Sequence, residues 1–474
     1  MNAPIVRLYA FFTLLFGVLV FATSWWSVFK AGEMRDNAAN RRPLLAEERI
    51  KRGTIRSADG KLLARSVKID KERYARRYPT DAMFAHAVGY SFTKLGRSGL
   101  EQFRNDPLTG RRTELIGAID SLLGERGEGD SIRTTLNSKA QQAAIDGVKG
   151  RKGAVVALEP KSGKVLVMTS SPSYDPNGLD EGNTFSRLSS DEQNSPLVNR
   201  STQSGYPPGS TMKVMTAAAA IDTGKYTPNS TVNGRNGKKV SGVPLNNFGG
   251  EDFGDITLTD ALTNSVNTVW AEVGEKLGKS TMGEYMTKFG FYEPPPIDLP
   301  ADQLLASGER GERGRLLSPT SRQIDVGRMA IGQDKLLVTP LQMATVAATI
   351  ANGGVRMEPH ITQKIVDPDG RTQDEIEGER AERVMNEDTA RDLTAMMKNV
   401  VKEGTGTAAA LEGVDLAGKT GTAEIDVERD INHAWFIGFT DEFAVAVVLE
   451  RVQGGTGGVD AAPIAKSVLE ALGE

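Results

Sequence analysis

Residues 206–213 read Tyr206-Pro207-Pro208-Gly209-Ser210-Thr211-Met212-Lys213, and the apolar run 214–221 follows directly. The Pro-Pro-Gly step ends the preceding loop, and the four alanines of the run favour a helix, which we expect over residues 211–223. Side chains three positions apart share one face of a helix, so the Lys213 amine can reach the Ser210 hydroxyl. The stretch therefore predicts a helix that begins beside a paired serine and lysine.

Two further short motifs follow in order along the chain. They are Ser265-Val266-Asn267 and Lys419-Thr420-Gly421-Thr422. The ordered set S-x-x-K, S-x-N, K-T-G is typical of serine acyltransferases that react with D-Ala-D-Ala peptides and with penicillin. Each motif alone is a weak signal, and the order carries the prediction.

The sequence contains two imperfect copies of these motifs. Ser91-Phe92-Thr93-Lys94 is also S-x-x-K, but Gly96 and Gly99 follow it and disfavour a helix. Lys161-Ser162-Gly163 is close to K-T-G, but it precedes Ser210 and has the composition of a hairpin turn. We therefore assign the active-site motifs to the other three positions.

The surrounding sequence predicts an α+β fold, in which one antiparallel sheet is built from two distant parts of the chain around a helical insert. The predicted strands are 154–158, 165–168, 419–424, 434–439 and 443–449. The predicted helices of the insert are 211–223, 257–263, 267–277, 340–352 and 388–402, and a final helix covers 463–472. Residues 255–260 are interpreted as a helix start, so that Ser265 follows in the next loop.

The N-terminal third carries three local signals. Residues 8–29 contain no charged side chain, and about 20 apolar residues cross a bilayer, so we expect an uncleaved single-pass anchor. Polar residues 31–52 follow as a linker. Apolar positions on both sides of Asp59-Gly60 predict a hairpin over 52–64, and Asn137 is expected to cap a helix over 138–148.

These signals suggest three parts. Residues 1–30 form a cytoplasmic tail and transmembrane anchor, residues 31–150 a small non-catalytic domain of the pedestal or dimerisation type, and residues 151–474 the catalytic domain. The alternative for residues 8–29 is a buried core helix, and the absence of a polar face along this segment argues against it.

Composition excludes several classes of function. The chain has 57 Lys and Arg against 61 Asp and Glu, a net charge of −4, which argues against a nucleic-acid binder. It has no cysteine, and its three histidines are far apart in the sequence, so we expect no metal site and no cofactor.

The proposed chemistry needs a base beside the serine. A serine hydroxyl is a weak nucleophile at neutral pH, and a lysine accepts its proton only when burial or a second cation lowers the lysine pKa. Lys419 is the expected second cation for Lys213. A lysine exposed on the surface would stay charged, and that is the alternative for Lys213 considered alone.

The remaining motif residues have both structural and catalytic interpretations. Ser265 and Asn267 can relay a proton and hold a lysine or a peptide amide, or they can merely cap a helix. Thr420 and Thr422 can bind a carboxylate on a strand edge where Gly421 admits a substrate backbone, or the strand can be an ordinary exposed one.

Together with the anchor and four further boxes, the three motifs resemble those of class B penicillin-binding proteins, closest to the actinobacterial PbpA-type D,D-transpeptidases. The boxes are 52–64, 99–101, 332–340 and 434–438. The resemblance implies a Ser210 nucleophile with Lys213 as base, a relay through Ser265, Asn267 and Lys419, and carboxylate binding by Thr420 and Thr422. It also implies an oxyanion hole formed by the N–H groups of Ser210 and Thr422.

The resemblance implies cross-linking of peptidoglycan stem peptides with release of D-Ala, and inhibition by β-lactams. It places the catalytic domain outside the cell membrane, in division or elongation. The region before the first strand is too short for a glycosyltransferase, so a separate SEDS-type partner of the RodA or FtsW kind is expected. The rivals are a serine β-lactamase, a catalytically idle scaffold and a penicillin-sensing receptor. A β-lactamase of one class would need a glutamate in an E-x-x-L-N context, which this chain lacks. The intact motifs argue against an idle scaffold. The third would need further membrane helices.

Overall fold

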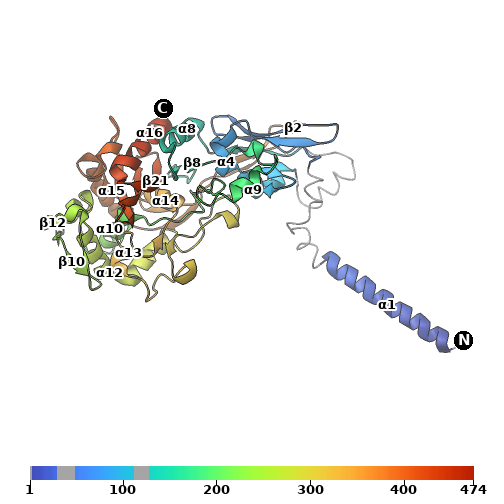
Figure 1. Ribbon diagram of the computed structural model, residues 1–474, viewed down its shortest axis with the longest axis horizontal. Helices are drawn as coiled ribbons and strands as arrows, with labels where there is room; N and C mark the ends of the chain where they lie inside the picture. The colour runs from blue at the N-terminus through green and yellow to red at the C-terminus, as the bar shows by residue number, and fades with distance from the viewer. Residues whose placement is uncertain (1–2, 29–47, 111–127, 474) are drawn as a thin grey trace.

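The computed structural model describes residues 3–28, 48–110 and 128–473 (Figure 1). Of the predicted linker over 31–52, residues 31–47 lie outside the described residues. Helix α1 (Ala3–Val28) contains the apolar run. Its segment Ala3–Trp25 has a mean hydropathy of 2.2 and is not buried by the rest of the chain. The sequence prediction of one N-terminal helix able to span a membrane is confirmed at the level of length and composition.

A five-stranded antiparallel sheet forms the centre of the larger part of the molecule. Its order is β19-β20-β21-β7-β8, so two early strands pair with three late ones, as the sequence predicted. The strands are β7 (Gly153–Leu158), β8 (Val165–Ser171), β19 (Ala417–Asp426), β20 (Ile431–Phe439) and β21 (Ala444–Gln453). Because β20 pairs β19 with the rest of the sheet, β19 lies at one edge and β8 at the other.

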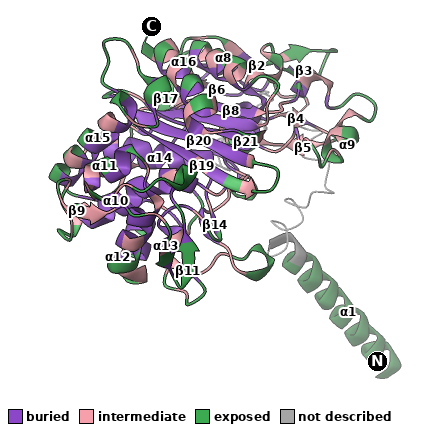
Figure 2. Ribbon diagram, turned by 60° about the vertical axis from the view of Figure 1, so that its left-hand side comes forward, coloured by how far each residue is buried: buried purple, intermediate pink, exposed green. Residues whose placement is uncertain are grey.

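Alternate residues of these strands enter two separate apolar cores. Val156 and Val448 face one core, whereas Val155 and Val447 face the other. This period of two is the reason that the strands read as continuous apolar runs. Figure 2 shows the buried sheet between its helical layers, with α14 (Pro340–Ala351) against it on one side.

Two helices cover the other face of the sheet. Helix α8 (Ser138–Val148) packs on α16 (Ala462–Gly473) and on β8. Asn137 caps α8 as predicted, because its side chain accepts the backbone N–H groups of Lys139 and Ala140, each at 3.0 Å. Although α8 falls within residues 31–150, its packing partners belong to the catalytic sheet.

The helical insert agrees with the sequence in outline and differs in detail. Helix α10 (Lys213–Asp222) begins two residues later than predicted, after a 3₁₀ turn at Gly209–Met212. Helix α12 (Asn267–Lys288) continues past residue 277, with a kink at Gly278, where φ is 80°. The helix start predicted at 255–260 is wrong at its beginning, since Asp255–Thr257 pairs as strand β12. Helices α11 (Leu258–Thr263) and α15 (Glu387–Lys402) match the prediction within one residue.

A second, six-stranded sheet organises the N-terminal part, in the order β17-β16-β6-β1-β2-β3. Its strands are β1 (Ile55–Arg56), β2 (Leu62–Lys68), β3 (Tyr74–Arg77), β6 (Ser131–Thr134), β16 (Thr362–Val366) and β17 (Thr372–Glu375). The predicted hairpin is confirmed, because Ile55 pairs with Ala64 across the Asp59-Gly60 turn. Strands β16 and β17 come from the helical insert and extend this sheet, which the sequence did not indicate.

The short elements complete the described fold. The helices are α4 (Ala85–Val88), α5 (Gly99–Phe103), α6 (Asn105–Leu108), α9 (Thr184–Ser189) and α13 (Val326–Met329). The two-stranded ribbons pair β4 (Ser91–Phe92) with β5 (Gly96–Arg97), β9 (Thr231–Asn233) with β12, β10 (Lys238–Val240) with β11 (Val243–Leu245), β13 (Gly308–Glu309) with β14 (Leu336–Leu337), and β15 (Val355–Met357) with β18 (Arg380–Arg383).

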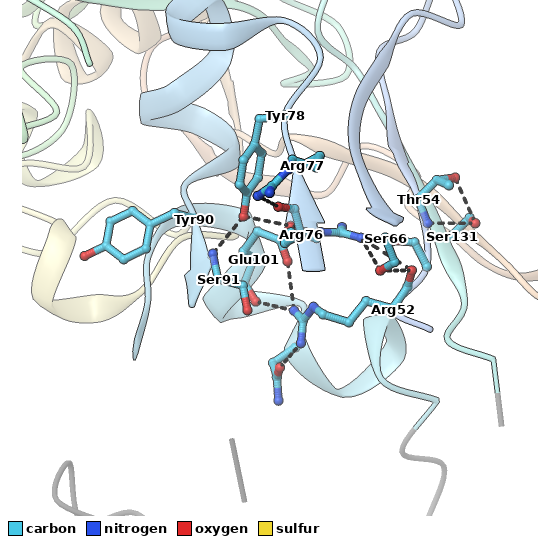
Figure 3. Close-up of polar contacts among 12 residues, drawn as sticks. Arg52, Thr54, Ser66, Arg76, Arg77, Tyr78, Tyr90, Ser91, Glu101 and Ser131 are labelled. Carbon is cyan, nitrogen blue, oxygen red and sulfur yellow. Dashed lines mark hydrogen bonds and ion pairs between the residues drawn. The ribbon is translucent and has the colours of Figure 1, made fainter. Parts of the chain in front are cut away.

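One buried carboxylate ties the N-terminal part together (Figure 3). Glu101, on α5, is fully buried and accepts Arg52 Nη2 at 2.8 Å and Arg76 Nε at 2.6 Å. Both arginines are themselves buried. Paired charges of this kind are costly to separate, because the partner left behind has no water to solvate it.

Candidate active site

Ser210 lies in the 3₁₀ turn that leads into α10. The turn is fixed by a close backbone crossing, because Gly209 has φ of 52° and donates its N–H to the Gly332 carbonyl at 3.0 Å. Thr211 Oγ1 donates to the Pro208 carbonyl at 2.8 Å and closes the loop. Ser210 is half-buried, and within the described residues its Oγ takes part in no hydrogen bond. The Ser210 hydroxyl is thus presented on a backbone that these two hydrogen bonds hold in place.

Lys213 is the first residue of α10 and is fully buried. Its Nζ lies 2.7 Å from the Ser265 carbonyl, 3.1 Å from Ser265 Oγ and 2.7 Å from Asn267 Oδ1. Ser210 Oγ is not among these hydrogen-bond partners. The alternative of an exposed, permanently charged lysine is therefore wrong for this residue.

Ser265 and Asn267 join the turn between α11 and α12 to both lysines. Ser265 has φ of 57°, a left-handed conformation that is uncommon outside glycine and costs on the order of 1–3 kcal/mol. Asn267 is the first residue of α12, and its Nδ2 donates to the Asn246 carbonyl at 3.0 Å. The alternative that both residues merely cap a helix is wrong, because α12 has no side-chain cap.

Lys419 approaches the same serine from β19. Its Nζ donates to Ser265 Oγ at 3.0 Å and to the Thr420 carbonyl at 3.0 Å. Ser265 Oγ therefore lies between the two amines, 3.1 Å from Lys213 Nζ and 3.0 Å from Lys419 Nζ. The three side chains thus form a continuous chain of hydrogen bonds.

The protonation of this group is set by burial. Burial lowers the pKa of Lys213 well below its ordinary value, and the charge of Lys419 lowers that pKa further. Burial also lowers the pKa of Lys419, to about 7. Two like charges that share one hydroxyl group do not both ionise readily. Burial of two neighbouring amines thus opposes the state in which both are charged.

Thr420, Gly421 and Thr422 lie on β19 at the free edge of the sheet. The expected role of Gly421 in admitting a substrate backbone needs correction. A Cβ at Gly421 would lie 2.8 Å from the Pro208 carbonyl oxygen and 2.9 Å from Thr211 Cγ2. The glycine therefore makes room for the chain's own Ser210 loop.

Further residues hold the motifs in place. Tyr206 and Trp435 lie in the stretches 206–213 and 434–438 that the sequence singled out, whereas Thr405 and Glu450 carried no signal. Thr405 Oγ1 lies 2.5 Å from Thr420 Oγ1 and holds it from the C-terminal side of α15. Trp435 Nε1 donates to the Pro207 carbonyl at 3.0 Å, and Tyr206 packs edge-on against Trp435 at 6.1 Å. The Tyr206 hydroxyl in turn donates to Glu450 at 2.5 Å.

The two imperfect motif copies lie elsewhere. Residues 91–94 belong to the β4–β5 ribbon of the N-terminal part, and residues 161–163 form the turn between β7 and β8. The structure thus separates them from Ser210, Ser265 and Lys419, as the motif order predicted.

Comparisons with known proteins place this geometry in a family. Residues 153–470 match the penicillin binding protein transpeptidase domain, and residues 52–132 match the penicillin binding protein A dimerisation domain. The chain is 35% identical to the peptidoglycan D,D-transpeptidase PbpA of Mycobacterium tuberculosis over 99% of both chains. It is 35% identical to the PbpA of Mycolicibacterium smegmatis, again over 99% of both.

The solved structures give the same result. The fold matches penicillin-binding protein A from M. tuberculosis in its ceftriaxone acyl-enzyme complex with a TM-score of 0.81 and 33% identity, covering 90% of this chain and 99% of the other. The penicillin G acyl-enzyme complex matches with a TM-score of 0.79. The chain therefore belongs to the class B penicillin-binding proteins of the PbpA type, which are β-lactam-sensitive peptidoglycan D,D-transpeptidases acting by serine acylation.

Proposed function

We propose that Ser210 is the acylated nucleophile of this transpeptidase and that Lys213 accepts its proton. The observation that carries the proposal is that Ser265 Oγ lies within hydrogen-bond distance of two fully buried lysines, 3.1 Å from Lys213 and 3.0 Å from Lys419. Ser265 then relays protons between the lysines, and Asn267 orients Lys213. Burial lowers the pKa of Lys213 so that it can act as a base, and the charge of Lys419 lowers that pKa further.

In the proposed reaction, Ser210 Oγ attacks the carbonyl between the two D-Ala residues of a stem peptide. The N–H groups of Ser210 and Thr422 stabilise the oxyanion. The tetrahedral adduct collapses to an ester as the terminal D-Ala leaves, and its amine takes the proton that Lys213 received. The amine of a neighbouring stem then attacks the ester, forms the cross-link and frees Ser210.

The substrate is proposed to lie along the free edge of β19. A peptide in extended form can add to an open sheet edge through main-chain hydrogen bonds. Thr420 and Thr422 would bind its terminal carboxylate, and Gly421 between them keeps the strand close to the Ser210 loop. The bond between Thr405 and Thr420 supports this role, because it fixes the orientation of one of the two hydroxyl groups.

The arrangement at the membrane is also a proposal. Helix α1 would be the single-pass anchor, residues 31–150 the non-catalytic module and residues 151–474 the catalytic domain outside the membrane, where peptidoglycan lies. Because α8 packs on α16 and on β8 of the catalytic sheet, we place the boundary between the non-catalytic module and the catalytic domain before Ser138 and no longer at residue 150. Fusion of alkaline phosphatase at the C-terminus should give an active reporter, and an inactive one would place the C-terminus on the cytoplasmic side.

Glycan polymerisation would require a partner, which we propose to be a SEDS-type glycosyltransferase of the RodA or FtsW kind. Copurification of the full-length chain with such a protein from membranes tests this step. Retention of the pair in detergent would support it, and independent elution of each would oppose it.

The acylation itself is tested by intact mass. Wild type and Ser210→Ala are incubated with a fluorescent penicillin and followed over hours. A stable adduct on wild type alone supports the proposal, whereas rapid loss of the adduct indicates a β-lactamase. A wild type that forms no adduct would indicate an idle scaffold.

A further inference from the structure

The N-terminal part of the structure carries an excess of positive charge that the transpeptidase reaction does not use. Of the 57 basic and 61 acidic residues of the chain, 14 basic and 7 acidic residues lie between positions 48 and 110, which leaves 43 basic and 54 acidic elsewhere. A basic module is thus joined to an acidic catalytic part. Such a separation gives the molecule a preferred orientation in an electric field.

The positive charge gathers on the β2–β3 hairpin and the ribbon beside it. Five exposed cations there have no carboxylate within 4 Å in the part of the chain that the structure describes: Arg65, Lys68, Lys71, Arg77 and Lys94. Arg65 and Arg77 even face each other directly across the two strands. Like charges in this position destabilise a hairpin unless an anion lies between them.

A cavity of about 310 Å³ opens at the base of this hairpin. Five basic residues line it: Arg52, Arg73, Arg76, Arg77 and Lys94. Two acidic residues, Glu48 and Asp180, line it as well, and Glu48 accepts the Thr93 hydroxyl and lies 3.9 Å from Arg73. Basic residues thus outnumber acidic ones in the lining by five to two, and Arg77 and Lys94 have no ion-pair partner among the described residues.

The buried floor of the cavity is also incompletely paired. Figure 3 shows Arg52 and Arg76 converging on Glu101, so one carboxylate serves two guanidinium groups. Arg76 is 5% exposed, and its Nη2 has no hydrogen-bond partner among the described residues. Unpaired buried donors are rare and carry a free-energy cost that an anionic ligand would remove.

We propose that this cavity and the hairpin cations, together the basic hairpin site, bind the phosphate group of an anionic membrane lipid. The inference rests on α1 as the membrane anchor. Val28 ends α1 and Glu48 lines the cavity, and the 20 residues from one to the other span at most about 70 Å. The tether holds the site near lipid headgroups at a high effective concentration.

Charge favours the same ligand. An anionic bilayer attracts Lys and Arg side chains close to its surface and repels the acidic catalytic part. Docking through the basic hairpin site would turn the N-terminal module toward the membrane and the active site away from it. The attraction acts only within about one Debye length, roughly 8–10 Å, so it requires contact of the hairpin with the headgroups.

The test uses the full-length chain in nanodiscs. Because the chain has no cysteine, Val67→Cys on β2 provides one position for an environment-sensitive fluorophore. Quenching by spin-labelled lipid is compared in phosphatidylcholine alone and with phosphatidylglycerol added. We expect stronger quenching in the anionic nanodiscs and its loss at high salt. Equal quenching in both would overturn the proposal and leave an acidic partner protein as the ligand to seek.

Matched variants distinguish binding through the basic hairpin site from a general effect of the protein's positive charge. The triple variant R65Q/R77Q/K94Q should shift the docking equilibrium by about fivefold for each residue, on the order of 100-fold together. The control variant K161Q/R315Q/K402Q removes three exposed charges outside the module and should dock like the parent. Equal losses in both variants would refute the assignment to the hairpin.

A further comparison distinguishes two sources of the same chemistry. Inorganic phosphate is titrated into the chain in neutral nanodiscs, and the fluorophore emission is followed. We expect no response at concentrations where the lipid saturates. A response of the parent that the triple variant lacks would assign the site to free phosphate and refute the lipid.

Discussion

Replacing Gly332 by alanine tests whether the backbone crossing behind Ser210 sets the rate of acylation. Gly332 has φ of 76°, and a Cβ built there would lie 2.0 Å from the Gly209 carbonyl oxygen. The two backbones must separate by about 1 Å before the contact reaches 3.0 Å, the lower limit for real Cβ contacts. Gly209 precedes Ser210, so this displacement moves the nucleophile. A misplacement of about 1 Å costs roughly 100-fold in rate.

The assay is the second-order rate constant for acylation by a fluorescent penicillin. The matched control is Gly370→Ala, in the turn between β16 and β17, where φ is 86° and no atom lies within 4 Å of the added Cβ. Both variants incur the left-handed backbone cost of about 1–2 kcal/mol, but only Gly332→Ala meets a steric clash. Gly332→Ala should therefore acylate about 100-fold more slowly than Gly370→Ala. Equal rates in two folded proteins would refute the reasoning.

Three other predictions concern the Lys213–Lys419 pair, the Thr405–Thr420 hydrogen bond and the buried Glu101 carboxylate. Lys419→Gln removes the charge that lowers the pKa of Lys213, so the rise of the acylation rate with pH, which follows neutral Lys213, should move to higher pH; an unchanged profile would contradict the coupling. Thr405→Val removes the 2.5 Å bond to Thr420 and should slow acylation about fivefold to tenfold, the equivalent of about 1–1.5 kcal/mol, with an unchanged thermal midpoint. Glu101→Gln leaves two buried guanidinium groups without a carboxylate and should cost about 3–5 kcal/mol, seen as a lower midpoint in a thermal melt; an unaltered midpoint would show that the pair is not needed for stability.

Local signals predicted the central sheet and its covering helices well. The strands over 154–158 and 443–449 are apolar on both faces and therefore stand out from the sequence, and Asn137 marks the start of α8 by its own side chain. The N-terminal hairpin followed from a single Asp-Gly turn. In each case the information lies within about ten residues.

Features that depend on distant contacts were not predicted. Strand β16 is only partly buried and β17 is exposed, and they join the sheet only because β16 pairs with the distant strand β6 and β17 pairs with β16. The start of α10 moved to Lys213 because the Gly209 crossing with Gly332 imposes a tighter turn. The left-handed conformation of Ser265 likewise depends on the two lysines around it. It could not be predicted locally, because the residue is neither a glycine nor an asparagine.

The chemistry of the site was predicted from the order of three motifs. How the residues of these motifs are arranged in space could be seen only in the structure. The sequence suggested burial and the charge of Lys419 as the two causes of a lowered Lys213 pKa, and in the structure both act, with burial the larger. The role expected for Gly421 changed because the space beside it belongs to Pro208 and Thr211. A short motif identifies the residues of the site, but it does not predict which other side chains and backbone atoms pack against them.

The shared sheet has a consequence for biogenesis. Strand β6 ends at Thr134, and its neighbour β16 begins at Thr362, 228 residues later. At about 5–20 residues per second, the ribosome needs roughly 10–45 s to deliver that strand. Until then β6 is an open edge that can pair with another chain. We expect nascent chains to depend on a holdase during this interval, and fragments that stop before residue 362 to aggregate even when their N-terminal sequence is intact.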